Sequence, residues 1–514
     1  MLWFFVFSLV VIGGAIGRRW PIPEAVVWCA LGFIFGFAPG AAGLTLSSKA
    51  ALLLLLPPLV YAAAVRLPWP EFRDNAGPIV LLAFGLVVLN ALAATYVSHR
   101  LIGLPWALAF ALGAVLSPTD PAAAVAVAAR AGIPGRLAAI LEGEGLVDDA
   151  VALTLVHLAV EAAVTRHFSL ESEGLQTLAI VVGEPLYGWL VGRAVMFLRR
   201  HILDPRLEIA VTLLTPFAAY LPCQYLGGSG VLATVTAGMY IGERRADVAP
   251  AGNRLHAASV WEIVVFLLYG ALFVMAGIEL CQVVQGTPAT RELLVWGLGI
   301  AGMLIALRGA WCGLMWGFFH KRTALREEGN RHMPGRHMTV IAGAGMRGPI
   351  SLAAALSIPL SAEISGAEFQ TVLFITAVVI AVTLVAQGIA LPHLVRVLHV
   401  ARDAASEHRD DEQQIAFAEG EAARAAMEHL ALLETRGQVT CEAAAKLRAY
   451  YKDRLSEIES GADRQPVLLS LIEAERARVE RLRAEELIND RVAAELERML
   501  DLRESGLRGS QIAA

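Results

Sequence analysis

Three acidic residues lie close together in a stretch of the chain that is otherwise apolar enough for a membrane. Glu144, Asp148 and Asp149 belong to the string Glu-Gly-Glu-Gly-Leu-Val-Asp-Asp-Ala within residues 137–164. On a helix, positions i, i+4 and i+5 share one face, so we expect the three carboxylates to form a cluster. A charged side chain at the centre of a bilayer costs about 2.5–3.5 kcal/mol, and such groups usually line an ion pathway or a proton relay. The cluster is therefore the first candidate for binding a cation or protons.

A second polar string interrupts the apolar span at 104–129, where Pro118 and Pro121 flank Thr119 and Asp120. Each proline lacks a backbone donor and clashes with the preceding turn, so the pattern predicts two half-helices with exposed backbone groups between them. Broken helices at membrane depth line cavities, and secondary transporters use them to build ion sites. A simple proline kink is the alternative.

A third string, Gly-Ala-Gly-Met-Arg-Gly-Pro, opens another apolar segment and carries a positive charge. The residues that loosen the helix there are Gly345, Gly348 and Pro349. Arg347 stays charged at any physiological pH, so inside a membrane it needs a carboxylate partner. Glu144 is the candidate, and we predict a structural ion pair between the two. Contact of Arg347 with the substrate, or a position nearer the membrane interface, is the alternative.

Three more polar residues lie in apolar spans, and we expect structural roles for them. We interpret Arg308 and Glu184 as scaffold or interface groups. His157 is interpreted as a packed core histidine, which is the more frequent role of a single histidine in an apolar helix.

The composition indicates an integral membrane protein, because 56% of the residues are hydrophobic and 17% are charged, with a mean hydropathy of +0.58. A bilayer needs roughly 20 helical residues, and thirteen apolar runs of about that length are expected. They lie near 2–17, 23–39, 50–65, 78–98, 104–129, 137–164, 175–198, 206–226, 228–242, 259–281, 293–319, 338–358 and 368–398. We do not expect the first run to be a cleaved signal, because Arg18 and Arg19 follow it instead of preceding it.

Lys and Arg are concentrated in one alternate set of loops, which includes Arg18, Arg19, Arg199, Arg200, Arg244 and Arg245. The other set holds Lys49, Arg100, Arg166 and Arg291. The positively charged loops of a membrane protein face the cytoplasm. We therefore expect a multi-pass protein of the cell membrane, with the N-terminus outside and the C-terminus in the cytoplasm.

The remaining composition excludes several partners. The five cysteines show no paired spacing, so neither a disulfide framework nor a zinc site is implied. The net charge of -5 comes largely from the C-terminal part, and we expect no nucleic-acid partner.

Residues 401–514 form a charged segment rich in Ala and Glu, which we expect to be a cytoplasmic helical tail. Helices are predicted at 411–435, 441–459 and 467–503, separated by glycine and proline. The apolar stripe of the last helix suits a small bundle or a dimer contact. A regulatory sensor is the alternative, and no ligand motif supports it.

Taken together, the three strings resemble the monovalent cation/proton antiporters of the sodium/proton exchanger type, particularly the bacterial branch. Thr-Asp-Pro in a broken span, Glu-Gly-Glu-x-Leu-x-x-Asp-Ala in the next and Gly-x-Arg-Gly before Ser-Leu-Ala appear in the family's order. With weaker matches such as Leu-Pro-Pro-Leu at 56–59, the resemblance covers residues 1–398.

The resemblance implies an all-α membrane fold with inverted repeats and two broken helices that cross at mid-membrane. It implies a transmembrane antiporter domain at 1–400, usually as a homodimer. The core helices would lie at about 78–164 and 293–398, and the scaffold or dimer helices at about 1–66 and 175–282.

The resemblance also assigns roles to residues. Asp149 would take up either the cation or protons, and Thr119 would lend an oxygen to the transported Na⁺. Glu144 would pair with Arg347. Asp120 would sit at the crossing of the broken helices, where its charge offsets helix-end dipoles. The expected cargo is Na⁺, with K⁺ or Li⁺ as alternatives, exchanged for H⁺ without a cofactor.

Two positions depart from the family pattern. Gly145 stands where a Ser is common, which removes one possible ligand oxygen, and Asp148 stands where an Asn is common. If Asp148 titrates together with Asp149, more than one proton moves per cation. If Asp148 stays protonated and donates a hydrogen bond, exchange is electroneutral. We favour the second reading, because no lysine lies in the membrane near the cluster.

Two other classes of function compete with antiport. An intramembrane metalloenzyme would use Glu144, Asp148, Asp149 and His157, but neither His-Glu-x-x-His nor Gly-x-Ser-x-Gly occurs. A cation channel would conduct without coupling to protons. The sequence also lacks the Gly-x-x-x-x-Gly-Lys phosphate loop, so we expect no use of ATP and no enzymatic activity.

Overall fold

The structure is a computed structural model. It describes residues 2–19, 23–38, 48–67, 69–165, 179–202, 204–244, 251–286, 291–324, 333–358, 365–460 and 465–485, with a few residues between 492 and 504. All regular elements within these ranges are helices. The chain divides into two compact units, Met1–Ala401 and Arg402–Ala514.

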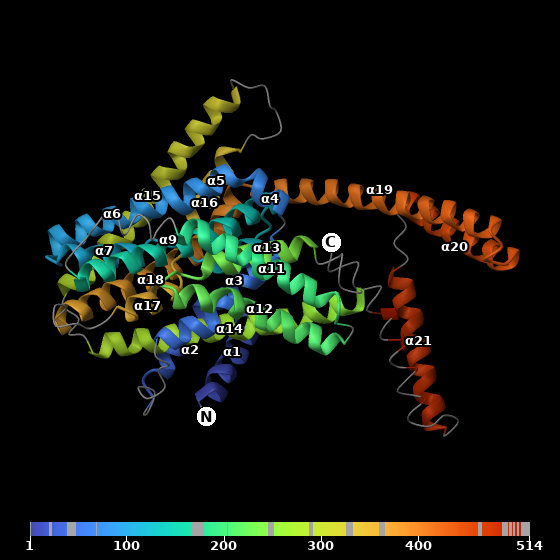
Figure 1. Cartoon of the computed structure of the whole chain (residues 1–514), viewed down its shortest axis with the longest axis horizontal. Coiled ribbons are helices and arrows are strands. Elements are labelled where there is room, and N and C mark those ends of the chain that lie inside the picture. The colour runs from blue at the N-terminus through green and yellow to red at the C-terminus, as the bar shows by residue number, and fades with distance from the viewer. Residues whose placement is uncertain are drawn as a thin grey trace. The chain divides into compact units, whose positions relative to one another are not determined.

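The first unit contains the apolar helices (Figure 1). These are α1 (Leu2–Arg19), α2 (Glu24–Phe35), α3 (Ser48–Arg66), α4 (Trp69–Asp74), α5 (Ala76–Val80), α6 (Val87–Val97), α7 (Trp106–Val115), α8 (Pro121–Ala129), α9 (Gly135–Thr165), α11 (Glu184–Arg199), α12 (Pro205–Tyr225), α13 (Val231–Arg244), α14 (Ala251–Gly286), α15 (Arg291–Ala324), α16 (Gly335–Gly343), α17 (Pro349–Leu356) and α18 (Gly366–Val397). Three π-helical segments, at Leu81–Leu86, Ser98–Ile102 and Ala179–Gly183, adjoin them.

Six described helices are long and apolar enough to cross a membrane: Ala76–Ile102, Ile180–Arg199, Pro205–Tyr225, His256–Gly286, Arg291–Phe319 and Gly366–Val397. The sequence predicted thirteen spans. Helix breaks explain part of the difference, because a broken span yields two helices that are each too short to cross a membrane alone. The 31-residue α9 is long enough to cross a membrane, but it is not among the six because the acidic cluster makes it less apolar. The count of thirteen spans and the inverted repeats remain predictions.

Both predicted helix breaks are present. The first separates α7, which ends at Val115, from α8, which begins at Pro121. Asp120 caps α8 by accepting a hydrogen bond from the amide of Ala123, and proline occupies the first helical position, where its missing donor costs nothing. The second break separates α16 from α17, which begins at Pro349.

The two breaks contact each other. The amide of Asp120 donates to the carbonyl of Met346 over 2.6 Å. A Cβ atom added at Gly348 would meet the carboxyl group of Asp120, at 2.6 Å from Oδ2. Glycine at 348 therefore lets the two breaks lie this close, and their crossing at mid-membrane remains a prediction.

Small residues let other helices of this unit approach each other closely. A side chain at Gly32 of α2 would overlap the carbonyl of Val274 in α14, and one at Gly277 would overlap the carbonyl of Cys29. Figure 1 shows α1 and α2 beside α14. Close backbone contact through glycine is typical of helix pairs in membranes.

The second unit contains α19 (Val400–Thr435), most of which lies beyond the boundary, α20 (Cys441–Ser460) and α21 (Gln465–Ala484). Gly437 has φ 69° and lies in the turn between α19 and α20. An ion pair of 2.5 Å between Glu434 of α19 and Arg448 of α20 joins the two helices.

The predicted helix at 467–503 is wrong as a single element. Arg476 pairs with Glu504 over 2.9 Å, although 28 residues of continuous helix would separate them by roughly 42 Å. Ile472 and Val479 also share a buried cluster with Leu500. The chain therefore folds back after α21. Val479 and Leu496 of the predicted apolar stripe pack in this cluster, whereas Leu468, Leu471, Val492 and Met499 are exposed.

Candidate functional site

The acidic cluster lies on α9, inside the first unit. The exposed fractions of Glu144, Asp148 and Asp149 are 2%, 1% and 7%. Helix α9 packs against α7 and α8, so all three acids face the first helix break. Glu144 and Asp148 have different main partners, and Asp149 has none among the described residues.

Asp148 accepts two hydrogen bonds from the break. The amide of Thr119 donates to Oδ2 over 2.9 Å, and the hydroxyl of Thr119 donates to the same oxygen over 3.0 Å. Oδ1 is buried and has no hydrogen-bond partner among the residues that the structure describes. Thr119, which we predicted as a ligand of the cation, therefore lies against Asp148.

Glu144 forms its ion pair with Arg308 of α15. The two guanidinium nitrogens donate to the two carboxylate oxygens over 2.5 and 2.9 Å. The exposed fractions of the two side chains are 2% and 1%. The prediction that Glu144 pairs with Arg347 is wrong. Its partner is Arg308, which we interpreted as a scaffold or interface group and which lies fully buried in the structure.

Packing explains this change of partner. A Cβ atom added at Gly345 would lie 2.5 Å from Cδ of Arg308. The glycine therefore leaves the space through which Arg308 reaches Glu144. Arg308 was already visible in the sequence as a charge within an apolar span, but the register of α15 decides where it points.

Arg347 joins the two helix breaks. Its Nε donates to the carbonyl of Leu116 over 3.1 Å, and Nη1 donates to the carbonyl of Gly345 over 3.0 Å. Its backbone amide donates to the hydroxyl of Thr383 over 3.2 Å. The side chain is fully buried, and Nη2 has no hydrogen-bond partner within the described ranges.

Asp120 has a partner that the sequence did not reveal. The hydroxyl of Tyr269 in α14 donates to Oδ1 of Asp120 over 2.5 Å, and the same oxygen accepts the amide of Ala123 over 3.1 Å. A tyrosine within an apolar helix carries no sequence signal of such a contact. Asp120 thus lies where the two helix breaks touch, and it is also hydrogen-bonded to α14.

Asp149 makes no hydrogen bond or ion pair with any residue in the described part of the chain. It lines a small cavity of ≈ 10 Å³, together with Pro118 and Ser351. That volume is about the space of one water-sized sphere. The carboxylate that the family resemblance assigns to transport is therefore the member of the cluster that has no partner among the described residues.

Gly145 allows α9 to approach the first break. A Cβ atom added there would overlap the ring of Pro121. A serine, which is common at this position in the family, has no space in this chain. Among the residues that line the cavity beside Asp149, Ser351 carries a hydroxyl group.

A larger cavity of ≈ 660 Å³ lies between α2, α8, α14 and α18, and Tyr269 is part of its wall. Arg130, which directly follows α8, pairs with Glu24 of α2 over 2.5 Å, and both residues line the cavity. The hydroxyl of Tyr269 thus connects this cavity with Asp120.

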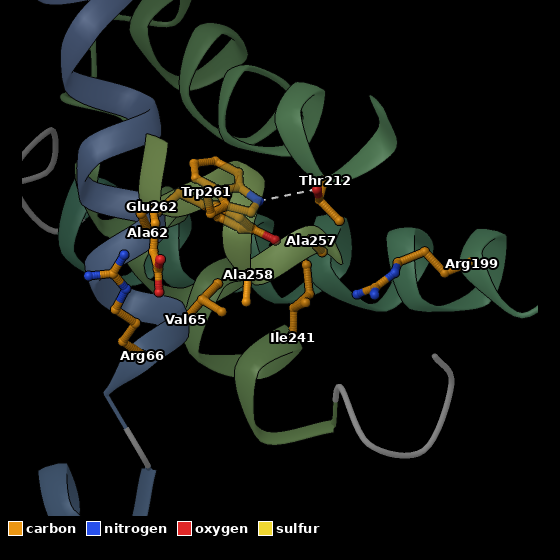
Figure 2. Close-up of a pocket in the computed structure, with 11 residues that line it drawn as sticks. Ala62, Val65, Arg66, Arg199, Thr212, Ile241, Ala257, Ala258, Trp261 and Glu262 are labelled. Carbon is orange, nitrogen blue, oxygen red and sulfur yellow. Dashed lines mark hydrogen bonds between the residues drawn. The ribbon is translucent and has the colours of Figure 1, made fainter. Parts of the chain in front are cut away.

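Another cavity, of ≈ 340 Å³, shares the lining residues Arg66 and Glu262 with the cavity of ≈ 660 Å³. Figure 2 shows these two side chains next to each other, and the indole of Trp261 donating to the hydroxyl of Thr212. That hydrogen bond is 3.2 Å long. None of the clustered acids lines this cavity, so it is separate from the site.

Two other polar residues have structural positions. Glu184 accepts hydrogen bonds from the amides of Ser229 and Gly230, over 2.6 and 2.9 Å, just before α13 begins. It therefore stabilises the start of that helix. His157 is exposed on α9, so its interpretation as a packed core histidine is wrong.

Comparisons with known proteins agree with this architecture. Residues 6–397 match the family model described as "Sodium/hydrogen exchanger, transmembrane". An uncharacterized Na⁺/H⁺ exchanger of Mycobacterium tuberculosis is 32% identical over 97% of this chain and 94% of its own length. A sodium, potassium, lithium and rubidium/H⁺ antiporter of Bacillus subtilis is 33% identical over 75% of this chain and 60% of the relative. Among solved structures, the sodium proton antiporter MjNhaP1 from Methanocaldococcus jannaschii matches with a TM-score of 0.59 and 18% sequence identity. The match covers 75% of this chain and 97% of that one, so the two proteins share a fold.

Proposed function

The chain belongs to the sodium/hydrogen exchanger family of membrane transporters, and we propose that it exchanges Na⁺ for protons by alternating access, with Asp149 binding either ion in turn. The family transports ions and is not a class of enzymes. The observation that carries the proposal is the state of Asp149, which is buried, has no partner among the described residues and borders a cavity of ≈ 10 Å³.

Competition for one carboxylate couples the two fluxes. A hard cation prefers oxygen ligands, and an ionised carboxylate attracts it. A proton on the same carboxylate removes the charge, and the cation is then released. A site that crosses the membrane only when it is occupied by one or the other exchanges the two ions, and either gradient can drive the exchange.

Three side chains and the backbone carbonyls at the helix breaks are candidates for holding the cation. Asp149 and Ser351 line the small cavity. The hydroxyl of Thr119 keeps free lone pairs while it donates to Asp148, and the broken helices offer backbone carbonyls. We propose Na⁺ as the main cargo. K⁺ is the second candidate, because the relative from Bacillus subtilis is named for Na⁺, K⁺, Li⁺ and Rb⁺.

We also propose a moving core, with helices at about 78–164 and 293–398, and a scaffold with helices at about 1–66 and 175–282. Support comes from the family and from the position of the cavity of ≈ 660 Å³, which lies between α8 and α18 of the first group and α2 and α14 of the second. A homodimer in the cell membrane with a cytoplasmic tail belongs to the same proposal.

The test is transport by Asp149→Asn in proteoliposomes loaded with a pH-sensitive dye. Na⁺, Li⁺, K⁺ and Rb⁺ are added in turn. We expect the unmodified protein to move protons on addition of Na⁺, and the variant to lose this response while it still inserts and elutes as a folded protein. Asp453→Asn on the exposed surface of α20 is the matched control. Undiminished exchange by Asp149→Asn contradicts the proposal, and Na⁺ flux without proton movement indicates a channel.

A further inference from the structure

Glu279 of α14 is a buried acid to which the proposed exchange at Asp149 assigns no role. Its exposed fraction is 8%, and it lies within the apolar span His256–Gly286. It forms no hydrogen bond or ion pair with any residue in the described ranges, and no described charged group acts on it electrostatically. Acids are rare in membrane spans, and those that occur usually mark an ion pathway or a proton relay.

Glu279 lies toward the end of α14 that is remote from the cavity of ≈ 660 Å³. Glu262 and Tyr269 of α14 line that cavity, and Glu279 follows Tyr269 by ten residues, which corresponds to a rise of roughly 15 Å. The helix becomes exposed at Val284, five residues further on. Because the arginine-rich loop before α14 is expected in the cytoplasm, Glu279 is expected near the outer surface of the membrane.

The helical turn before Glu279 packs against a residue that lines the small cavity of Asp149. Positions 275 and 279 are four residues apart and share one face of α14. Met275 belongs to a buried cluster against which Ile350 of α17 packs. Ile350 also lines the cavity of ≈ 10 Å³ together with Asp149. The face of α14 that carries Glu279 is therefore directed toward α17 beside the site.

The helical turn after Glu279 is connected with the same cavity. Val283 shares a buried apolar cluster with Val156 of α9 and Ala354 of α17, and both of these residues line the cavity of Asp149. Positions 279 and 283 again share one face of α14. This apolar layer lies between the cavity of Asp149 and the C-terminal end of α14, and Glu279 borders it.

We propose that Glu279 binds protons and Na⁺ in an outer passage, which opens beside this apolar layer and connects Asp149 with the outer solution. The inference rests on the proposed function of Asp149 and on the proposed movement of the core against the scaffold. Helices α9 and α17 belong to the core and α14 to the scaffold, so this movement separates them across the layer. Water then reaches Glu279 and the cavity of Asp149 together.

The state of the passage determines the charge of Glu279. While the passage is closed, an isolated carboxylate would be a costly buried charge, so the neutral acid is the stable form. When water enters, the acid releases its proton to the outer solution, and the carboxylate then attracts Na⁺. A proton that Asp149 releases passes through this water to Glu279, and Na⁺ takes its place at Asp149. Cys29 of α2 is a titratable side chain that also packs against the layer.

The test measures Na⁺-dependent proton movement separately from the two faces, in right-side-out and in inside-out membrane vesicles. Glu279→Gln should raise the KM for Na⁺ roughly tenfold from the outer face, because negative charge in a cleft concentrates cations about 10-fold or more. The KM from the cytoplasmic face should stay unchanged. Glu279→Asp keeps the charge and should recover most of the affinity.

The pH dependence separates ion binding from packing. In the unmodified protein, the KM from the outer face should rise more steeply with falling pH than in Glu279→Gln, because protonation removes the charge only from a carboxylate. Glu292→Gln, at the exposed start of α15, is the matched control. It removes the next acid along the chain and should alter neither the KM nor its pH dependence.

The possible failures are distinguishable. A carboxamide has nearly the size of a carboxyl group, so the melting temperature of Glu279→Gln should equal that of the unmodified protein. An unchanged KM from the outer face, or a change from the cytoplasmic face, overturns the inference and leaves the proposed function intact. Absence of Na⁺-dependent proton movement by the unmodified protein contradicts the proposed function itself.

Discussion

Arg308 holds Glu144 through two parallel hydrogen bonds of 2.5 and 2.9 Å, and both side chains are almost completely buried. A third bond, from Nε of Arg308 to the carbonyl of Ile341 over 3.0 Å, ties the same guanidinium group to α16. The ion pair therefore joins α9, α15 and the half-helix before the second break.

Arg308→Ala should destabilise the protein by about 3–5 kcal/mol, because it leaves the carboxylate of Glu144 buried without a partner. Arg308→Ala with Glu144→Gln should be more stable than Arg308→Ala alone. Thermal unfolding in detergent measures both. Arg347→Ala is the control, and Glu144→Gln is combined with it in the same way. If Glu144→Gln recovers more melting temperature with Arg347→Ala than with Arg308→Ala, the pair of Glu144 and Arg347 that the sequence suggested is correct.

Tyr269→Phe removes the hydroxyl that donates to Asp120 and keeps the ring. Hydrogen bonds to charged groups contribute about 1.5–3 kcal/mol, so we expect a clear fall in melting temperature. Tyr187→Phe is the control, since that hydroxyl donates to the neutral carbonyl of Ala218 at an exposed position. Equal effects of the two changes would show that the charge of Asp120 is irrelevant to the contact.

Gly145→Ser should reduce stability and transport together, although serine is common at this position in the family. The added side chain overlaps the ring of Pro121, and overpacking costs about 1–3 kcal/mol. Gly299→Ser on α15 is the control, because a Cβ atom there meets nothing within 4 Å. Higher Na⁺ affinity without loss of stability would mean that α9 moves to accept the hydroxyl.

Ser351→Ala should raise the KM for Na⁺ severalfold and leave thermal stability nearly unchanged, because it removes a candidate oxygen ligand beside Asp149. Ser357→Ala is the control, since its hydroxyl bonds the carbonyl of Ala354 in the same region. The KM is obtained from initial rates of Na⁺-dependent proton movement. An unchanged KM would remove Ser351 from the ligand set.

Local chemistry made the helix breaks predictable from the sequence. Proline and glycine restrict the backbone wherever they occur, so Pro118, Pro121 and Pro349 marked the breaks without knowledge of the packing. The three acids were predictable as a cluster for the same reason, since their spacing on one helix fixes their common face.

Contacts between distant helices could not be predicted in this way. Two arginines were available to Glu144, and the space beside Gly345 lets Arg308 approach. Tyr269 gave no signal, because its role depends on where α14 lies relative to the first break. The return of the chain after α21 was equally hidden, since a continuous helical pattern does not show where a turn occurs.

The contact between the two breaks also has a consequence for the biosynthesis of the protein. Arg347 donates to a carbonyl 231 residues earlier in the chain, and Met346 accepts the amide of Asp120. A ribosome that adds 5–20 residues per second needs roughly 10–50 s to make the intervening segment. During that interval the nascent first break lacks these partners, and unpaired backbone groups in hydrocarbon are costly. The translocation machinery or bound water must shelter it until the second break emerges, so a chain truncated before Met346 should be a substrate for membrane quality control.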